Sequence, residues 1–207
     1  MPCWNVSIVK SKKQLAITLS QLKLPDKLNV GLEQYITPSE IAADMVWTAL
    51  PDLQDGTVAD FGCGNGILGI GASLVGAKKV FLLDTDKNML ALAKQNANSL
   101  SIDNAEFVEA DVSDFYEHVD VVIQNPPFGI QSRKADKPFI ETALQSADVV
   151  YSLHAPDSEP FLLAIAKEYG FTLEKLKTYD FVIGHSYHFH TKPTKSVKAV
   201  YWRFSRM

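Results

Sequence analysis

Short apolar runs alternate with longer amphipathic segments through most of the chain. From residue 57 onward, runs rich in valine, isoleucine and leucine predict strands at 57–61, 79–83, 106–109, 119–123 and 149–153. Segments with apolar residues at helical spacing predict helices at 67–75, 87–99, 138–147 and from 157 or 158 to 169. Strands that alternate with helices of this length are typical of βαβ units, in which helices cover both faces of a parallel sheet.

Helices are also predicted before the first strand. One lies at 12–23, where leucines recur at helical spacing ahead of Pro25. The other begins within 37–40 and runs to Pro51. Residues 1–50 are therefore expected to form an N-terminal helical segment ahead of the alternating region.

The last part of the chain predicts two strands with no helix between them, at 172–179 and 198–204. Such strands should pair antiparallel at one edge of the sheet. We therefore expect an α/β fold with a doubly wound, mostly parallel, seven-stranded Rossmann-like sheet and an antiparallel last strand. No linker composition marks a second domain, so residues 1–207 are expected to form a single one.

Composition agrees with that fold and argues against several others. Of 207 residues, 46% are apolar and 21% are charged, which is ordinary for a globular domain and unlike disordered, collagen-like or disulfide-rich chains. No apolar run approaches the roughly 18 residues of a membrane span, and the polar, lysine-bearing segment after Met1 is unlike a signal peptide. The two cysteines, Cys3 and Cys63, suit a reducing compartment, so we expect a cytoplasmic protein.

The net charge of −4 is unevenly distributed. Residues 1–30 carry +4, residues 31–124 carry −11 and residues 125–207 carry +3. The acidic total argues mildly against a nucleic-acid-binding protein, but basic ends can still form one face that holds a polyanion. An ordinary solvated surface explains the same distribution equally well.

A glycine-rich segment, 60–66 (Asp-Phe-Gly-Cys-Gly-Asn-Gly), joins a predicted strand to a predicted helix. Glycines there allow a sharp turn and a close approach of the backbone to a nucleotide-like ligand. In one register, starting at Gly64, the chain fits the dinucleotide pattern G-x-G-x-x-G, with Asp84 twenty residues further on. In the other, the segment resembles the first motif of S-adenosylmethionine (SAM) dependent methyltransferases, with its positions at Asp60, Gly62, Gly64 and Gly66. A glycine turn that binds nothing is the third possibility.

Acidic residues also lie at the ends of the next two strands. Asp84 ends the second, where a carboxylate can accept both hydroxyls of a ribose, in NAD or in SAM alike. In methyltransferases, an acid at the place of Asp111, after the third strand, accepts the exocyclic amine of the cofactor's adenine. Each could instead be a helix N-cap, but acids at successive strand ends favour a cofactor site.

The segment Asn125-Pro126-Pro127-Phe128 follows the fourth strand, where a ligand pocket is expected. Prolines have no N–H and hold the preceding residue extended, so the Asn125 side-chain oxygen and the Pro126 carbonyl become fixed acceptors beside the ring of Phe128. Two such acceptors suit the hydrogens of a planar exocyclic amine, and the ring can stack on its base. Because an amide is no useful base, catalysis would rest on positioning and electrostatics. The predicted chemistry is methyl transfer to a planar amine, with these four residues as the catalytic ones.

Asn-Pro-Pro-Phe also resembles the fourth motif of amino-methyltransferases, which act on adenine N6, cytosine N4 or a glutamine amide. With the segments 32–38 (Leu-Glu-Gln-Tyr-Ile-Thr-Pro), 150–154 (Val-Tyr-Ser-Leu-His) and 186–190 (Ser-Tyr-His-Phe-His), the chain resembles the small-subunit ribosomal RNA adenine-N6 methyltransferases of eukaryotes and their archaeal relatives. The resemblance implies the class I methyltransferase fold, SAM as the cofactor and an N-terminal segment over the cofactor site. It implies cofactor contacts at Gln34, Thr37, Gly62, Asn65, Asp84 and Asp111, with any contact of Asn65 made through its backbone.

Other residues are candidates for holding RNA. Basic side chains that suit phosphate contacts follow the Asn-Pro-Pro-Phe segment and recur in the tail: Arg133, Lys134, His190, Lys192 and Lys195. Tyr35 and Tyr187 could stack on bases, and no histidine spacing predicts a metal site. A structured RNA could supply specificity through its shape. Glutamine-amide and DNA amino-methyltransferases are the alternatives, but they usually carry an additional domain for which this chain has no room.

Eukaryotic members of the family work with a small zinc-bearing activator subunit that adds a strand to the edge beside the third strand. Here 106–109 is a short expected edge with Phe107 between two acids, which could take such a partner or protect itself. Beside the methyltransferase hypothesis, two others stay open: a dinucleotide-dependent oxidoreductase and a non-catalytic nucleic-acid-binding module that kept the fold.

Overall fold

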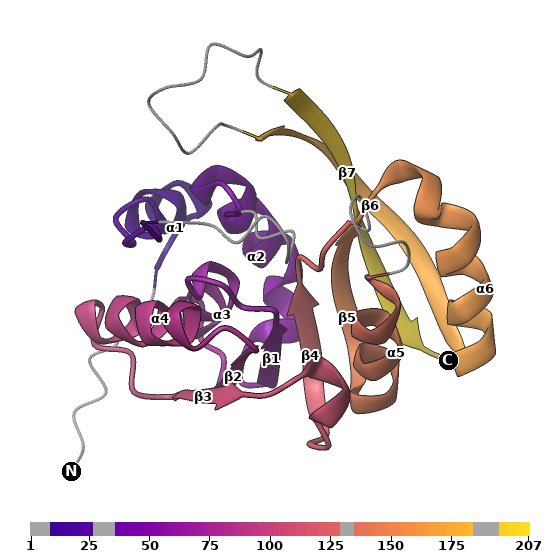
Figure 1. The fold of residues 1–207 in the computed structure, drawn as a ribbon, viewed down its shortest axis with the longest axis horizontal. Coiled ribbons are helices and arrows are strands. Elements are labelled where there is room, and N and C mark those ends of the chain that lie inside the picture. The colour runs from indigo at the N-terminus through magenta and orange to yellow at the C-terminus, as the bar shows by residue number, and fades with distance from the viewer. Residues whose placement is uncertain (1–8, 27–35, 129–134, 184–194) are drawn as a thin grey trace.

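The expected alternation of strands and helices is present in the computed structural model (Figure 1). The structure describes residues 9–26, 36–128, 135–183 and 195–207, without the side chains of 181–183 and 195–197. The helices are α1 (Lys12–Leu19), α2 (Ser39–Leu53), α3 (Ile67–Leu74), α4 (Lys87–Ser99), α5 (Lys137–Ser146) and α6 (Glu159–Tyr169), with short 3-10 helices η2 (Val112–Asp114) and η3 (Pro156–Ser158). The strands are β1 (Thr57–Phe61), β2 (Lys79–Asp84), β3 (Ala105–Glu109), β4 (Val119–Gln124), β5 (Ala147–His154), β6 (Phe171–Ile183) and β7 (Lys195–Arg206).

The strands form one seven-stranded sheet in the order β3-β2-β1-β4-β5-β7-β6. Neighbours from β3 to β5 are parallel, whereas β7 is antiparallel to both β5 and β6. This confirms the predicted doubly wound fold with antiparallel pairing at one edge. The chain order reverses between β1 and β4, and it is at such a reversal that ligands bind beyond the carboxyl ends of the strands.

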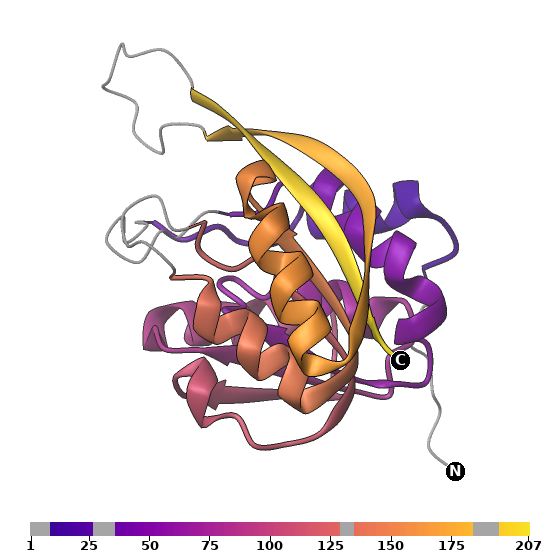
Figure 2. The ribbon, with the colours of Figure 1, turned by 90° about the vertical axis from the view of Figure 1, so that its right-hand side faces the viewer.

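Helices cover both faces of the sheet because side chains alternate along each strand. On one face, Val58, Leu82 and Ile123 share a buried cluster with residues of α1 to α4. On the other face, Phe61 and Val122 share a second cluster with residues of α5 and α6. Figure 2 shows α5 and α6 on the near side of the sheet. Burial on both faces explains why the strands appeared in the sequence as nearly continuous apolar runs.

Two helix ends differ from the prediction. α1 ends at Leu19 rather than at residue 23, because the Lys23 N–H donates to Asn96 Oδ1 on α4 (2.8 Å) instead of to a carbonyl of the helix. α2 continues past Pro51 to Leu53. A proline in the last turn removes only one N–H from the helix, and the fully buried Leu53 gives that turn a contact with the core.

The strands next to the expected pocket are longer than predicted. β4 and β5 each run one residue further, to Gln124 and His154, and these added residues are polar and buried. β6 and β7 also extend well beyond their predicted bounds and form a long hairpin that projects past the helices in Figure 2. Within the described ranges, no helix is long and apolar enough to cross a membrane.

Candidate active site

A small cavity lies where the carboxyl ends of β1 and β4 meet the segment that precedes α2. Its volume is about 30 Å³, and its lining includes Thr37, Asp60, Gly62, Gly64 and Asn125. The glycine-rich segment ends 59 positions before the first residue of the Asn-Pro-Pro-Phe segment in the sequence. The fold brings them to one site because β1 and β4 are adjacent parallel strands.

The glycine-rich segment needs glycine at more than one position. Gly66, which precedes α3, has φ +85°, and a Cβ there would lie 3.0 Å from Leu82 Cδ2. Gly64 has φ +55°, but a Cβ there would meet nothing within 4 Å. Gly64 is therefore the point where the loop backbone is open to a ligand, whereas Gly66 permits the close packing of α3 on β2.

Asp84 connects the end of β2 to this loop. One carboxylate oxygen accepts the Gly64 N–H (2.8 Å) and the other accepts the Asp86 N–H (2.9 Å). Burial raises the pKa of Asp84, while these two N–H donors act in the opposite direction. Each oxygen keeps a second lone pair, so the carboxylate can still accept hydroxyl groups of a bound ribose.

Asp60 is almost completely buried at the end of β1, with 1% of its surface exposed. Its Oδ2 accepts the N–H of Gly69 in α3 at 2.8 Å. Loss of hydration raises the pKa of Asp60 to about 7, the Gly69 N–H lowers it, and the neighbouring Asp84 raises it further. Asp60 thus lines a cavity whose described lining contains no lysine or arginine, and Asp84 lies next to that lining through its bond to Gly64.

Asn125 is oriented by Thr37. Its Nδ2 donates to Thr37 Oγ1 at 3.0 Å, and the Thr37 hydroxyl is buried. With the amide nitrogen engaged, the amide oxygen is the end of Asn125 that can accept a hydrogen bond from a substrate. The resemblance implied a contact of Thr37 with the cofactor, and the structure adds this contact with Asn125.

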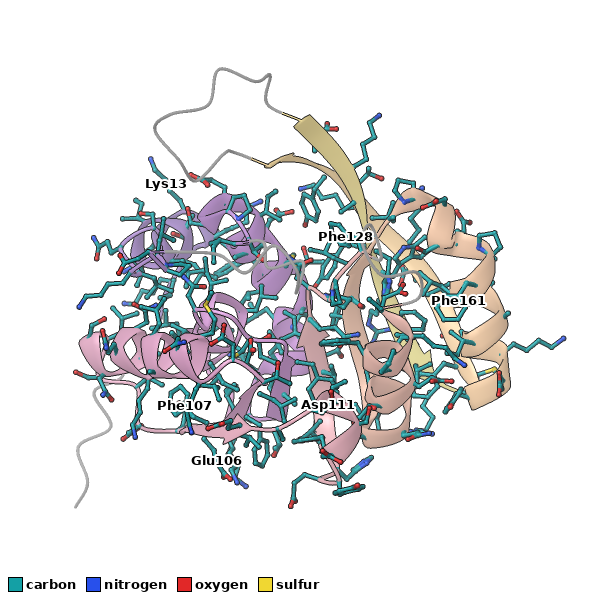
Figure 3. All side chains as sticks on the ribbon, viewed as in Figure 1. Lys13, Glu106, Phe107, Asp111, Phe128 and Phe161 are labelled. Atoms are coloured by element: carbon teal, nitrogen blue, oxygen red, sulfur yellow. The ribbon has the colours of Figure 1, made fainter. Side chains whose placement is uncertain are left out.

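The rest of the Asn-Pro-Pro-Phe segment lies beside that amide. Pro126 is buried, and Pro127 and Phe128 are half-buried. Phe128 packs against the core cluster on the α2 side of the sheet, and Figure 3 shows it near the carboxyl ends of β4 and β5. The ring is therefore packed against the core at this end of the sheet, and its predicted stacking on a base stays a prediction.

Asn65 is occupied by contacts within the protein. Its side-chain Nδ2 donates to the Lys23 carbonyl (3.2 Å), and its own carbonyl accepts from Asn96 Nδ2 (2.9 Å). These bonds attach the chain after α1 to the glycine-rich segment. The backbone contact of Asn65 with the cofactor that the resemblance implies stays a prediction.

Asp111 is exposed after β3, and Figure 3 labels it beside η2. Its Oδ1 accepts the Ser113 N–H (2.9 Å), so the N-cap interpretation is correct for this oxygen. The other carboxylate oxygen is available to a ligand. The two roles that the sequence left open are therefore compatible.

Several predicted residues lie outside the described part of the chain. They are Gln34, Tyr35, Arg133, Lys134, Tyr187, His190 and Lys192. Lys195 begins β7, but its side chain is not described. The predicted RNA contacts therefore stay predictions.

No sequence pattern indicated the buried polar chain at the ends of β4 and β5. It consists of Gln124, Ser152, His154 and Asp136. Ser152 and His154 alternate on one face of β5, and only that spacing could have suggested that they act together. In the described ranges, no group of three or more His, Cys, Asp or Glu side chains could hold a metal ion.

The residues at this site fit a nucleoside cofactor with a cationic part. The open backbone at Gly64 lets the ligand approach closely, and Asp84 beside it can take ribose hydroxyls. Asp84 raises the electrostatic cost of ionising Asp60. A positively charged ligand would offset that repulsion.

Comparisons with known proteins agree with this arrangement. Residues 39–150 match the family described as the methyltransferase small domain. The Methanocaldococcus jannaschii protein MJ0284 is 33% identical over 95% of this chain and 94% of its own length. The rRNA N(6)-adenosine-methyltransferase METTL5 of Danio rerio is 31% identical over 93% of this chain and 98% of its own length. The crystal structure of PH1948 from Pyrococcus horikoshii, described as a candidate RNA methyltransferase, has a TM-score of 0.86 at 37% identity and covers 95% of this chain and 96% of that one.

Proposed function

Because the chain belongs to the methyltransferase small domain family, we propose that it transfers a methyl group from SAM to the N6 amine of an adenosine in ribosomal RNA. The similarity to METTL5 over nearly the whole of both chains supports this substrate class. We further propose the small ribosomal subunit as the source of the RNA, and residues 1–207 as one domain acting in the cytoplasm. The family membership favours the methyltransferase register of the glycine-rich segment over the dinucleotide register.

The observation that carries the proposal is the orientation of Asn125. Thr37 takes its amide nitrogen, so the amide oxygen is the group offered to a substrate hydrogen. An exocyclic amine has two hydrogens, and the Pro126 carbonyl is the second acceptor in the same segment. The lone pair of adenine N6 is delocalised into the ring, so two fixed acceptors favour the geometry in which this nitrogen can attack.

Bound SAM supplies an electrophilic methyl group on a sulfonium centre. The loop at Gly64 would lie against the cofactor, Asp84 would accept its ribose hydroxyls and Asp111 its adenine amine. Asp60 would supply negative charge beneath the loop. Gln34 and Thr37 complete the proposed cofactor contacts from the N-terminal segment.

The protein's part in the chemical step is positioning. Asn125 Oδ1 and the Pro126 carbonyl hold the amine, and Phe128 stacks on its base. They would hold the amine nitrogen in line with the methyl carbon that bound SAM supplies, with the neutral thioether as the leaving group and solvent as the acceptor of the amine's proton. No side chain has to accept that proton in the transition state, which is consistent with an amide rather than a carboxylate at position 125.

A groove beside this site could hold the RNA backbone. It has a volume of about 380 Å³, lies between α1, the first turn of α2 and β6, and is lined by Lys12, Lys13 and Lys177 together with Glu40 and Asp44. Asp44 binds Lys12 (2.6 Å) and Lys177 (2.5 Å) and holds them in place. Lys13 carries no ion pair within the described ranges, which makes it the lysine most able to contact a phosphate.

The activator subunit implied by the resemblance is part of the same proposal. Among the described strands, β3 pairs with β2 alone, so its outer edge ends the described sheet. Glu106 and Glu109 are bound by Lys79 and Lys87, and Phe107 is half-buried beside Glu106 in Figure 3. With its carboxylates paired, this edge has little charge of its own to repel an added strand.

Methylation of small ribosomal subunits that lack the modification, read by nucleoside mass spectrometry, tests the proposed function. We expect N6-methyladenosine as the product, and Asn125→Ala to reduce the rate at saturating SAM by about 10²–10³, the scale of losing one preorganised polar partner. SAM affinity, measured by calorimetry, should be retained. Asn98→Ala, at an exposed position on α4, is the matched control and should keep full activity.

Other outcomes would redirect the assignment. Methylated cytosine or a methylated glutamine side chain as the product would identify one of the other amino-methyltransferase classes. Binding of NAD but not of SAM would contradict the methyltransferase register. Full activity of Asn125→Ala would contradict the amine-positioning mechanism.

A further inference from the structure

The buried polar chain introduced above connects the residue before Asn125 to the start of α5. Gln124 Nε2 donates to Ser152 Oγ at 3.0 Å, and Ser152 Oγ lies 2.8 Å from His154 Nε2. His154 Nδ1 in turn lies 3.2 Å from Asp136 Oδ2. Gln124 and Ser152 are fully buried and His154 is 1% exposed, so water cannot replace these partners.

The hydrogen bonds of this chain have a consistent direction. Gln124 donates to Ser152, so the Ser152 hydroxyl can donate to His154 Nε2, and the proton on Nδ1 is then donated to Asp136. One atom has no partner: Gln124 Oε1 is buried without a hydrogen bond in the described part of the chain. A buried acceptor without a partner is costly, and an apolar core would avoid that cost. Stability alone therefore does not account for the chain.

Asp136 is used in an unusual way. It is the N-cap of α5, where an aspartate side chain ordinarily accepts a backbone N–H of the first turn. Its side chain makes no such capping bond and instead reaches His154. The first helical bond of α5 is made by the Ile140 N–H to the Asp136 carbonyl at 3.1 Å. His154 therefore fixes the residue from which α5 begins.

The first turn of α5 touches the cofactor loop. A Cβ at Gly62 would lie only 3.0 Å from Phe139 Cε1, so the Phe139 ring packs directly on the Gly62 backbone. The polar chain therefore connects two parts of the site. One end is at β4, which leads directly into Asn125. The other end is at α5, whose Phe139 packs on the glycine-rich segment.

We propose that His154 is a positioning residue for methyl transfer. Through Asp136 it holds the first turn of α5 against the Gly62 loop, and through Ser152 and Gln124 it holds the end of β4 beside Asn125. These contacts keep Asn125 and the Gly62 loop at the separation that in-line transfer needs. Small displacements of either would lower the rate strongly.

Two substitutions at His154 separate positioning from simple stability. His154→Leu removes both hydrogen bonds but suits the apolar surroundings, whereas His154→Asn places an amide N–H close to the position of Nδ1 and can keep the bond to Asp136. We expect His154→Leu to reduce kcat by roughly 10–100-fold at saturating SAM and RNA, and to weaken SAM binding by much less than it reduces kcat. His154→Asn should retain more activity than His154→Leu and be no more stable to heat. If His154 only stabilised the fold, the two variants would rank in the same order by kcat and by thermal stability.

The matched control is the exposed pair of His118 and Asp148, whose Nε2 and Oδ2 are 3.6 Å apart with side chains 63% and 55% exposed. His118→Leu should change neither kcat nor SAM affinity. If His154→Leu does not fold, Asp136→Ala removes the same bond at a less buried position and should show the same loss of kcat.

The kinetic measurement rests on the proposed function, because it needs the RNA substrate. A second measurement therefore does not use activity. The amide of Ile140 should exchange with solvent faster in His154→Leu and in Asp136→Ala than in the wild type, and His118→Leu should leave it unchanged. Wild-type protein that binds SAM but methylates no RNA would refute the proposed function while this second measurement still tests the positioning. Unchanged exchange at Ile140, or equal kcat in folded His154→Leu and wild type, would overturn the inference.

Discussion

Replacing Asp60 with asparagine should change how the stability of this protein depends on pH. Asp60 is 1% exposed, and burial raises its pKa to about 7 in the native state from an ordinary value of 3.8. Asparagine has nearly the same shape, and its amide oxygen can still accept the Gly69 N–H that Oδ2 now accepts at 2.8 Å. The substitution therefore removes the titration and keeps the hydrogen bond.

The direction and size of the effect follow from linkage between protonation and folding. Between pH 4 and pH 7 the unfolded chain has lost the Asp60 proton while the native state retains it, so the stability that this proton contributes is lost as the pH rises through about 7. With these two pKa values, the contribution falls by about 2–3 kcal/mol between pH 5 and pH 8. For a domain of this size that corresponds to a decrease in Tm of roughly 5–10 °C. Asp60→Asn should lack this decrease.

The assay is urea and thermal unfolding of the SAM-free protein from pH 5 to pH 8, followed by circular dichroism. The quantity of interest is the wild-type free energy of unfolding minus that of the variant, because other titrating groups cancel in the difference. Asn98→Ala, which changes an exposed side chain that does not titrate, is the control and should follow the wild-type pH profile. Parallel profiles for wild type and Asp60→Asn would show that Asp60 is ionised throughout and that the burial argument is wrong.

Four further outcomes are expected. Asp84→Ala should weaken SAM binding by about 1–3 kcal/mol in calorimetry, the cost of leaving ribose hydroxyls without a charged acceptor; unchanged affinity would remove Asp84 from the site. Thr37→Val should lower kcat by allowing the Asn125 amide to turn, and Thr37→Ser should restore it; equal rates for both variants would rule out that role. Phe128→Ala should slow methylation through the loss of about 1–3 kcal/mol of base stacking, and Phe128→Tyr should recover most of the rate. Lys13→Ala should weaken RNA binding and reduce its salt dependence without affecting SAM, whereas a retained salt slope would place the RNA elsewhere.

Local patterns in the sequence predicted most of the fold. β1 and α4 have the predicted bounds because a buried strand needs an apolar run and a helix needs apolar residues on one face. The glycine-rich segment and Asp84 came together as expected, since both follow adjacent parallel strands. These features depend on spacing within about twenty residues, which a sequence displays directly.

Contacts across long separations could not be predicted in the same way. Thr37 and Asn125 are 88 positions apart, and nothing in either neighbourhood indicates the other. His154 lies within a segment that the resemblance singled out, yet its partner Asp136 is at the start of another element and no sequence pattern connects the two. The sequence also did not predict helix ends that depend on a tertiary contact. The end of α1 is an example, because the Lys23 N–H binds Asn96 on α4.

The placement of two carboxylates in the site gives the cofactor a role in stability as well as in chemistry. Asp60 and Asp84 each lose hydration and Asp84 also raises the pKa of Asp60, so the protein without ligand carries an electrostatic cost near neutral pH. A ligand with cationic groups favours the ionised carboxylates and offsets that cost. Binding of SAM should then release a fraction of a proton when the pH lies below about 7, and Asp60→Asn should abolish the release. Calorimetry in buffers with different ionisation enthalpies measures this quantity, and identical binding enthalpies in all buffers for the wild type at pH 6 would mean that Asp60 does not respond to the cofactor.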